Sequence, residues 1–202
     1  ASPVTPLVRV AANRSDQIGK ALDVGAEGVI VPMVNTVEEA RSAVAACYYP
    51  PLGQRSCGPM RPAMLEGVEY LATANEQIAC LLMIETEEGL RNVEEIAAVP
   101  GVTGLFVGPV DLCYGLGLSP MDFAHARFTE AVGRILSACV EHGIVAGMFG
   151  YTPEMAKNYL ANGFNFASAG TDISFVREGV TRALAGARGS EDEASGGERA
   201  GY

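Results

Sequence analysis

The sequence has no apolar run long enough to span a membrane, and it has fewer basic residues than acidic ones. Its longest apolar runs have the length of a strand, which argues against a membrane-spanning helix. The net charge of -10 argues against a nucleic-acid partner, because an acidic surface repels phosphate. No stretch near residue 1 has the basic and apolar regions of a secretory leader. We therefore predict a cytoplasmic protein with neither a membrane nor a nucleic acid as its partner.

Cysteine and histidine are scarce, and neither is spaced as a set of metal ligands. The five cysteines form no CxxC pair, which predicts free thiols in a reducing compartment rather than disulfides or a zinc site. The two histidines, His125 and His142, fall at the expected start and end of one helix, where capping or surface roles are expected. No GxGxxG motif follows the first expected strand, so a dinucleotide-binding sheet has no support.

The chain is organised around two short apolar runs, Cys80–Ile84 and Gly104–Val107, which read as strands buried on both faces. Each run ends close to a carboxylate, Glu85 or Asp111. Apolar residues at helical spacing between them predict a helix over Thr86–Val99 and hence a parallel strand pair. Both carboxylates then lie at the carboxyl edge of adjacent strands, where parallel α/β folds carry their chemistry. Two acids there predict a site for a hard divalent cation, with helix capping as the alternative.

The rest of the chain predicts further strands and helices in alternation. Strands are expected at Pro6–Val10, Gly28–Pro32, Ile144–Met148 and Phe166–Ala169. Helices are expected from a cap at Asn13 or Ser15 through Val24 to a stop at Gly25, over Thr36–Cys47 with Thr36 and Glu39 as a capping box, and at Val68–Asn75, Phe128–Glu141, Pro153–Asn162 and Ile173–Ala185.

Six strands, each followed by a helix, fit either an open doubly wound sheet or part of a barrel. We favour a (β/α)8 barrel of the TIM type with about six of its eight units in residues 1–185. The chain begins on a buried strand, so we expect that an upstream segment is missing. Residues 186–202 have no apolar face and are expected to form a disordered tail.

Other residues could serve a site at the carboxyl edge. Arg9 lies in an otherwise buried strand, where it either forms a structural ion pair or holds an anionic oxygen in the mouth of the barrel. The strand exit at Gly108 can expose the backbone N–H groups of Val110 and Asp111 to a carboxylate. Cys113 and Tyr114 are at most pocket lining.

The loop YYPPLGQRSCGPMRPAMLEG is rich in proline and glycine and is too long for an ordinary connection. Loops of this length inside a compact α/β domain usually have a function. Its arginines, Arg55 and Arg61, could close over a substrate, with solvent exposure as the default expectation.

Several of these motifs, in this order and spacing, resemble the HpcH/HpaI family of metal-dependent class II pyruvate aldolases. The motifs are ALDVGAEGVIVPMVNTVEEA, YYPPLGQRS, MIET and GLFVGPVDLCYGLG, and the resemblance extends over Pro6–Ala185. The family includes 4-hydroxy-2-oxoheptanedioate and 2-dehydro-3-deoxyglucarate aldolases. The resemblance implies a (β/α)8 barrel that assembles as a homo-oligomer, commonly a hexamer in which the eighth helix is exchanged between subunits.

The resemblance also implies roles for particular residues. Glu85 and Asp111 match the ligands of Mg²⁺, Mn²⁺ or Co²⁺, and Arg9 matches the catalytic arginine that stabilises the developing oxyanion. Asp23 matches a catalytic aspartate that tunes the family's histidine. Our reading of the pattern places Asp23 at a helix end on the opposite side of the barrel, so it would act across a subunit interface or be structural.

The substrate-binding positions implied by the resemblance are Gly108, Met83, and the backbone amides of Val110 and Asp111, which receive the pyruvate carboxylate. Met83 is a departure, because the family commonly has a substrate-contacting glutamine there. The family's general base, a histidine in a DGEH-type motif, is also absent from this sequence. The base is then expected from an upstream segment or from metal-bound water.

The expected reaction is aldol cleavage or condensation of a 4-hydroxy-2-oxo acid, giving pyruvate or a close 2-oxo acid and an aldehyde through an enolate. Two alternatives remain open. One is a carbon–carbon lyase of the citrate-lyase β-subunit or malyl-CoA type, which needs a basic groove for coenzyme A. The other is a truncated, inactive barrel that acts as a component of an oligomer.

Overall fold

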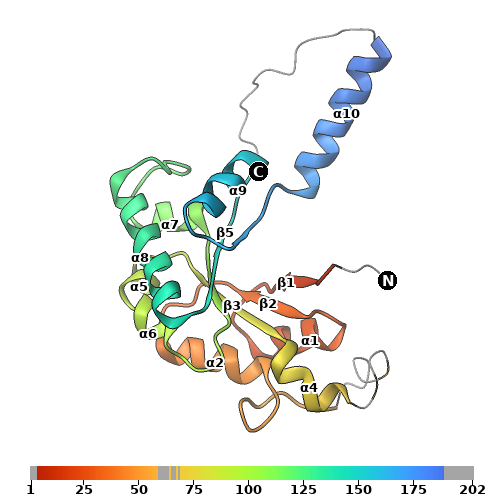
Figure 1. The fold of residues 1–202 in the computed structure, drawn as a ribbon, viewed down its shortest axis with the longest axis vertical. Helices are drawn as coiled ribbons and strands as arrows, with labels where there is room; N and C mark the ends of the chain where they lie inside the picture. Colours follow the sequence, from red (N-terminus) through yellow and green to blue (C-terminus); the bar gives the residue numbers. More distant parts are fainter. Residues whose placement is uncertain (1–3, 59–63, 65–66, 68, 189–202) are drawn as a thin grey trace.

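The computed structural model describes residues 4–58, 64, 67 and 69–188, and Figure 1 shows their arrangement. The strands are β1 (Leu7–Arg9), β2 (Gly28–Val31), β3 (Ala79–Ile84), β4 (Gly104–Val107), β5 (Val145–Met148) and β6 (Phe166–Ala167). The helices are α1 (Ser15–Asp23), α2 (Val37–Cys47), α4 (Tyr70–Gln77), α5 (Glu87–Arg91), α6 (Val93–Ala97), α7 (Pro109–Gly115), α8 (Ala126–His142), α9 (Pro153–Ala161) and α10 (Asp172–Arg188).

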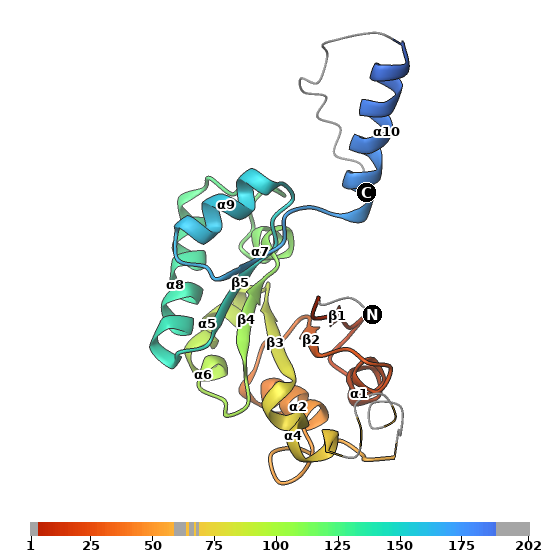
Figure 2. The ribbon, with the colours of Figure 1, turned by 45° about the vertical axis from the view of Figure 1, so that its right-hand side comes forward.

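The six strands form one parallel sheet in the order β1-β2-β3-β4-β5-β6. A doubly wound sheet reverses its strand order at a switch point. The described strands have no such reversal, which excludes that alternative for this part of the chain. The sheet curls, and the helices that connect its strands lie on its outer side (Figure 2). The fold is therefore a curled, six-stranded parallel half-barrel.

The capping box predicted for the second helix is confirmed. Thr36 Oγ1 accepts a hydrogen bond from Glu39 N, and the Glu39 carboxylate accepts one from Thr36 N. The cap predicted for α1 is wrong, because the residue before the helix is Arg14, which makes no side-chain cap hydrogen bond. The Asn13 side chain instead donates to Glu39 O, which ties the start of α1 to α2. The stop at Gly25 is confirmed by its φ of 108°.

One helix was predicted over Thr86–Val99, and the structure has two, α5 and α6, which meet at Asn92. Asn92 has a φ of -102° and a ψ of 12°, and its side chain donates to Asn35 O at 2.7 Å. This contact joins residues that are far apart in the sequence, so helical periodicity alone does not reveal it. Two other differences are local. Val24, an apolar residue at the end of the first predicted helix, is 57% exposed, and α7 was not predicted.

The last helix, α10, stands away from the sheet (Figures 1 and 2) and has no buried residue. It continues through Arg188, so residues 186–188 belong to a helix rather than to the predicted tail. Residues 189–202 of that tail lie outside the described residues. In the described part of the chain, no helix is both long enough and apolar enough to cross a membrane.

Side chains on the inner face of the sheet fill the half-barrel in rows. Met83, Phe106, Gly147 and Phe166 are register partners across β3, β4, β5 and β6, so they share one face. The Phe106 and Phe166 rings lie 5.6 Å apart, between their centroids, on either side of Gly147. A Cβ at Gly147 would meet Phe106 Cδ2 at 2.5 Å and Phe166 Cδ1 at 3.2 Å. Glycine at this position therefore makes room for the two rings.

We predict that Gly147→Ala destabilises the protein, because the added methyl group has no space between the two rings. The expected loss is about 1–3 kcal/mol of unfolding free energy, measured by urea denaturation. Gly133→Ala is the matched control: Gly133 lies inside α8, and a Cβ there meets nothing within 4 Å. That change should stabilise the helix by about 1 kcal/mol. Equal effects of the two substitutions would contradict the role of Gly147 as a spacer.

Candidate functional site

Glu85 is the buried carboxylate at the carboxyl end of β3. It follows Met83 by two residues, so it points to the same inner face of the sheet. Its exposed fraction is 2%, and its Oε1 accepts a hydrogen bond of 2.7 Å from Met33 N. Its Oε2 is buried and has no hydrogen-bond partner among the described residues. Because leaving a buried carboxylate oxygen unpaired is costly, this atom is a candidate for binding a ligand.

Gly108, at the end of β4, gives Glu85 the space that it occupies. A Cβ at Gly108 would collide with Glu85 Oε2 and would also lie 3.0 Å from Met83 Cε. Any larger residue would therefore displace the carboxylate. The first turn of α7 follows directly, and the N–H groups of Val110 and Asp111 lie there without intrahelical acceptors. The structure thus brings Met83, Gly108, Val110 and Asp111 to one edge of the sheet, near Glu85.

Two further charges act on Glu85 at this edge. The pKa of Glu85 is raised above its ordinary value of 4.5, mainly by burial and further by the negative charge of Asp111. The Met33 N–H and the positive charge of Arg9 act in the opposite direction and lower it. Asp111 is exposed in the first turn of α7. Arg9 pairs in register with Ile30, which pairs with Leu81, so its side chain shares the inner face. The structure brings Arg9, Glu85 and Asp111 within electrostatic reach of one another.

These residues fit a hard divalent cation. Among the described residues there is no group of three or more histidines, cysteines, aspartates or glutamates that could hold a metal ion. Glu85 and Asp111 are two oxygen ligands, and Mg²⁺ is commonly held by one or two carboxylates with water and substrate oxygens completing the shell. The unpartnered Oε2 of Glu85 supplies the lone pairs that such an ion needs.

The other residues singled out in the sequence, two beside Asp111 and the two histidines, differ in their placement. Cys113 is buried and Tyr114 is 60% exposed, so only Tyr114 is open to solvent. His125 precedes α8, and its Nδ1 accepts from Arg127 N, which confirms the capping role. His142 lies in the last turn of α8, before Gly143. Neither histidine lies at a strand end.

Asp23 and Arg55 form an ion pair at the opposite, amino-terminal edge of the sheet. Asp23 is the last residue of α1, and its Oδ1 accepts from Arg55 Nη2 at 2.7 Å and from Arg55 Nε at 3.2 Å. Arg55 also donates to the Tyr70 hydroxyl and stacks on the Tyr49 ring at 4.7 Å. Burial disfavours the charged guanidinium, but the hydrogen bonds with Asp23 and Tyr70 outweigh it and raise the pKa of Arg55. The expectation that Arg55 is solvent-exposed is wrong, since its exposed fraction is 5%.

Arg55 was difficult to predict because its partners come from other parts of the chain. The long loop in which it lies folds back under α1 and is tied there by this ion pair. Arg61, the other arginine of the loop, lies outside the described residues. The described part of the loop is therefore anchored at the amino-terminal edge, away from Glu85.

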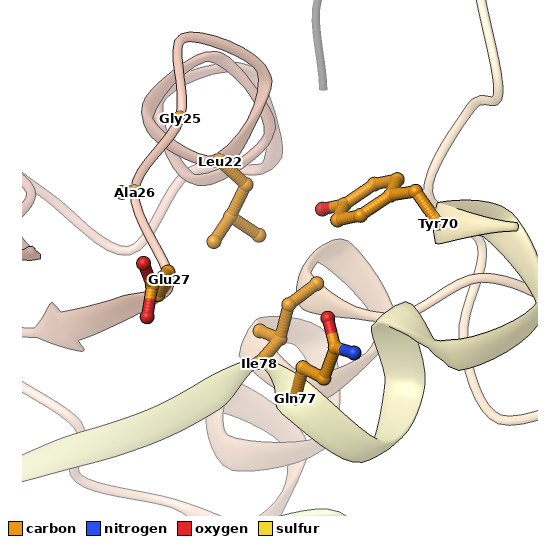
Figure 3. Close-up of a pocket in the computed structure, with 7 residues that line it drawn as sticks. All are labelled: Leu22, Gly25, Ala26, Glu27, Tyr70, Gln77 and Ile78. Carbon is orange, nitrogen blue, oxygen red and sulfur yellow. The ribbon is translucent and has the colours of Figure 1, made fainter. Parts of the chain in front are cut away.

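A cavity of about 390 Å³ opens at the same amino-terminal edge (Figure 3). It is lined by Leu22, Gly25, Ala26, Glu27, Tyr70, Gln77 and Ile78. Figure 3 shows the Tyr70 ring facing Leu22, with Ile78 and Gln77 below them. These residues come from the end of α1, the connection between α1 and β2, and the segment from α4 to the residue before β3. The cavity is thus separate from the carboxyl edge that carries Glu85.

A family model described as HpcH/HpaI aldolase/citrate lyase matches residues 1–178. The chain is 40% identical over 184 residues to a hydroxypyruvate/pyruvate aldolase of Rhizorhabdus wittichii, covering 91% of this chain and 73% of that protein. It is 38% identical over 191 residues to a 2-dehydro-3,6-dideoxy-6-sulfogluconate aldolase of Pseudomonas putida, covering 92% and 73%. A solved HpcH/HpaI aldolase/citrate lyase family protein from Burkholderia cenocepacia matches with a TM-score of 0.83 and 34% identity, covering 92% and 74%.

We predict that Glu85 makes the stability of the metal-free protein depend on pH. Burial raises the pKa of Glu85 above 4.5, so between the unfolded and the folded pKa the folded state holds more protons. The unfolding free energy therefore falls as the pH rises through that window, and above the folded pKa the loss is complete. Glu85→Gln removes this dependence, so the variant should exceed the wild type in stability at about pH 8 and lose that advantage toward about pH 4.

The measurement is urea denaturation in the presence of a chelator across this pH range. Glu88→Gln, which changes an exposed glutamate on the adjacent α5, is the control and should leave the pH dependence of the wild type unchanged. A constant difference between Glu85→Gln and the wild type at every pH would contradict the prediction.

We predict that Asp23→Ala destabilises the fold, because it leaves the buried Arg55 charge without its partner. The Arg55 side chain is 2% exposed, and the expected loss is about 3 kcal/mol of unfolding free energy. The double variant Asp23→Ala/Arg55→Met should regain part of that loss. The control is Asp16→Ala, on the same helix as Asp23. It breaks an exposed ion pair with Arg14 and should have little effect on the unfolding free energy. Wild-type stability together with lost activity in Asp23→Ala would instead indicate a catalytic role.

Proposed function

The chain belongs to the HpcH/HpaI aldolase/citrate lyase family, and from that premise we propose that it is a carbon–carbon lyase that cleaves a 4-hydroxy-2-oxo acid. The products are pyruvate, or a close 2-oxo acid, and an aldehyde, and the reverse reaction is the corresponding aldol condensation. Its relatives at 40% and 38% identity are aldolases, which supports this reaction over a citrate-lyase type. The observation that carries the proposal is the buried, unpartnered Oε2 of Glu85 at the carboxyl edge.

We propose that Glu85 and Asp111 hold a divalent cation, Mg²⁺, Mn²⁺ or Co²⁺. When bound, such an ion supplies Lewis-acid stabilisation for the negative charge that develops on the 2-oxo oxygen of the substrate. The two carboxylates differ in setting, which supports a division of labour. Glu85 is buried and held in place, whereas Asp111 lies in the first turn of α7, where its carboxylate is exposed to solvent.

The neighbouring groups supply binding and charge. The N–H groups of Val110 and Asp111, at the positive end of α7, are placed to receive the substrate carboxylate. Arg9 adds positive charge to the inner face, where it can stabilise the enolate oxygen. Met83 lines the floor beside Gly108 with an apolar side chain, so the site has no hydrogen-bond donor from that position.

The geometry restricts the role that Asp23 can have. Within one chain Asp23 pairs with Arg55 at the edge opposite Glu85, so it cannot touch a substrate held by Glu85. If Asp23 acts in catalysis, we propose that it does so on the site of a neighbouring subunit.

We further propose that the half-barrel is part of a (β/α)8 barrel over residues 1–185 and assembles as a homo-oligomer, with a hexamer as the state expected from the family. The exposed apolar side chains of α10, which include Ile173 at 75% and Val176 at 66% exposure, support assembly. The free thiols of the described chain support a cytoplasmic location, and the net charge of -10 supports a small-molecule rather than a nucleic-acid partner.

A titration with Mn²⁺, with and without pyruvate, tests the site. We expect Mn²⁺ to bind and pyruvate to strengthen the binding, because the 2-oxo acid adds two oxygen ligands to the ion. Glu85→Gln should lose the binding, and Asp111→Asn should lose metal-dependent release of pyruvate from a 4-hydroxy-2-oxo acid. Glu88→Gln is the matched control and should behave as the wild type.

Undiminished metal-dependent turnover by Asp111→Asn would refute its role as a ligand. Folded wild-type protein that fails to bind Mn²⁺ would mean that the carboxylates are helix caps. Turnover of a coenzyme A thioester, but not of free oxo acids, would favour the citrate-lyase type instead.

A further inference from the structure

Met33, at the exit of β2, has a backbone conformation that its own side chain does not explain. Its φ is 57°, in the left-handed region that residues other than glycine, asparagine and aspartate rarely adopt. Its side chain is 51% exposed, so burial of the thioether does not compensate for the conformation. A strained residue of this kind persists only where the surrounding structure imposes it, and it then points to a function of the backbone.

The two residues that follow Met33 are held in place by other parts of the chain. Val34 N donates to Met83 O at 3.4 Å, and Asn35 N donates to the Glu39 carboxylate at 2.7 Å. The Asn35 side chain accepts from the Thr86 hydroxyl, and Asn35 O accepts from Asn92. The segment after β2 is therefore held by β3, by the start of α2 and by the junction of α5 and α6.

With the segment after β2 held in this way, the main-chain N–H group of Met33 points at Glu85. Met33 N donates to Glu85 Oε1 at 2.7 Å, and the Glu85 carboxylate has no other hydrogen-bond donor among the described residues. With Oε1 held, the carboxylate has one orientation, and Oε2 lies against Gly108 without a partner. A carboxylate that is free to rotate could offer either oxygen to a ligand, whereas Glu85 offers Oε2.

We propose that Met33 is a positioning residue of the metal centre: its main-chain N–H fixes Glu85 Oε1 and so assigns Oε2 as the metal-ligating oxygen. The inference rests on the proposed function, because it takes Glu85 as a ligand. It adds that the site depends on a backbone conformation at the end of the neighbouring strand β2, at a residue whose side chain makes no hydrogen bond to Glu85. The identity of residue 33 then matters through the φ that it tolerates.

The test compares substitutions that differ in their tolerance of a left-handed conformation. Met33→Gly and Met33→Asn accept a positive φ and keep the N–H, so both should bind Mn²⁺ within about threefold of the wild type. Met33→Ile keeps the N–H and an apolar side chain but disfavours the conformation, so Mn²⁺ affinity should fall about 10- to 100-fold, as it does when a group that orients a ligand is lost. Mn²⁺ affinity is measured by calorimetry without substrate, and the melting temperature is recorded for each variant.

Met121 provides the matched control, because it is also a methionine at positive φ, 64°, and its side chain is 48% exposed. Its recorded main-chain hydrogen bond is from Phe123 N to its carbonyl, not to Glu85. Met121→Ile should therefore lower the melting temperature as Met33→Ile does, while Mn²⁺ affinity stays at the wild-type value. The difference between the two isoleucine variants isolates the contact with Glu85 from strain in general.

Each outcome decides the matter. Wild-type Mn²⁺ affinity in Met33→Ile, or an equal loss in Met121→Ile, would overturn the proposal. If Met33→Ile does not fold, Met33→Gly and Met33→Asn still decide it: retained affinity supports the main-chain role, and lost affinity shows that the side chain is needed. A wild-type protein that binds no Mn²⁺, or Glu85→Gln that binds as well as the wild type, would refute the metal site itself.

Discussion

The removal of the Glu85 carboxylate from water is the constraint on which the carboxyl edge of the sheet depends. A buried carboxylate is stable only if its oxygens find partners or a cation. One oxygen finds the Met33 N–H, and the other finds none among the described residues. Gly108 leaves the space that Oε2 occupies, and Met33, at a positive φ, supplies the N–H that holds Oε1. The positive φ of Met33 is thus a local irregularity of the fold that lies directly beside this carboxylate.

The two edges of the sheet have different tasks, as is common in parallel α/β folds. At the amino-terminal edge, the Arg55 guanidinium is paired with Asp23 and contacts Tyr70 and Tyr49. These contacts stabilise its buried charge. At the carboxyl edge, Glu85 is half satisfied. Both edges contain a buried ionisable side chain, and the two differ in hydrogen bonding: Arg55 has several partners, whereas one oxygen of Glu85 has none among the described residues.

The strands and most helices could be predicted from the sequence because local patterns determine them: apolar runs for β3 and β4, and the Thr36 capping box for α2. The carboxylates could be placed at one edge because parallel connections put successive strand ends together. The break at Asn92 and the role of Met33 could not, because each depends on a hydrogen bond between residues 57 and 52 positions apart in the sequence. The ion pair of Arg55 was missed for the same reason. The positive φ of residue 33 could not be predicted, because methionine, unlike glycine or asparagine, does not indicate such a conformation.

If Glu85 and Asp111 hold a divalent cation, as proposed, the described residues offer it two carboxylates and no third grouped ligand. Hard oxygen ligands favour Mg²⁺ or Mn²⁺ over softer ions, and the buried thiols of the described chain are not grouped as a competing set. Two protein ligands would leave most of the coordination shell to water and substrate, so we expect a modest affinity for the ion alone and a higher one in the presence of a 2-oxo acid. With so few protein ligands, the orientation of each one matters more. In the proposed centre, the single N–H group that holds Glu85 in place would therefore affect the affinity for the ion.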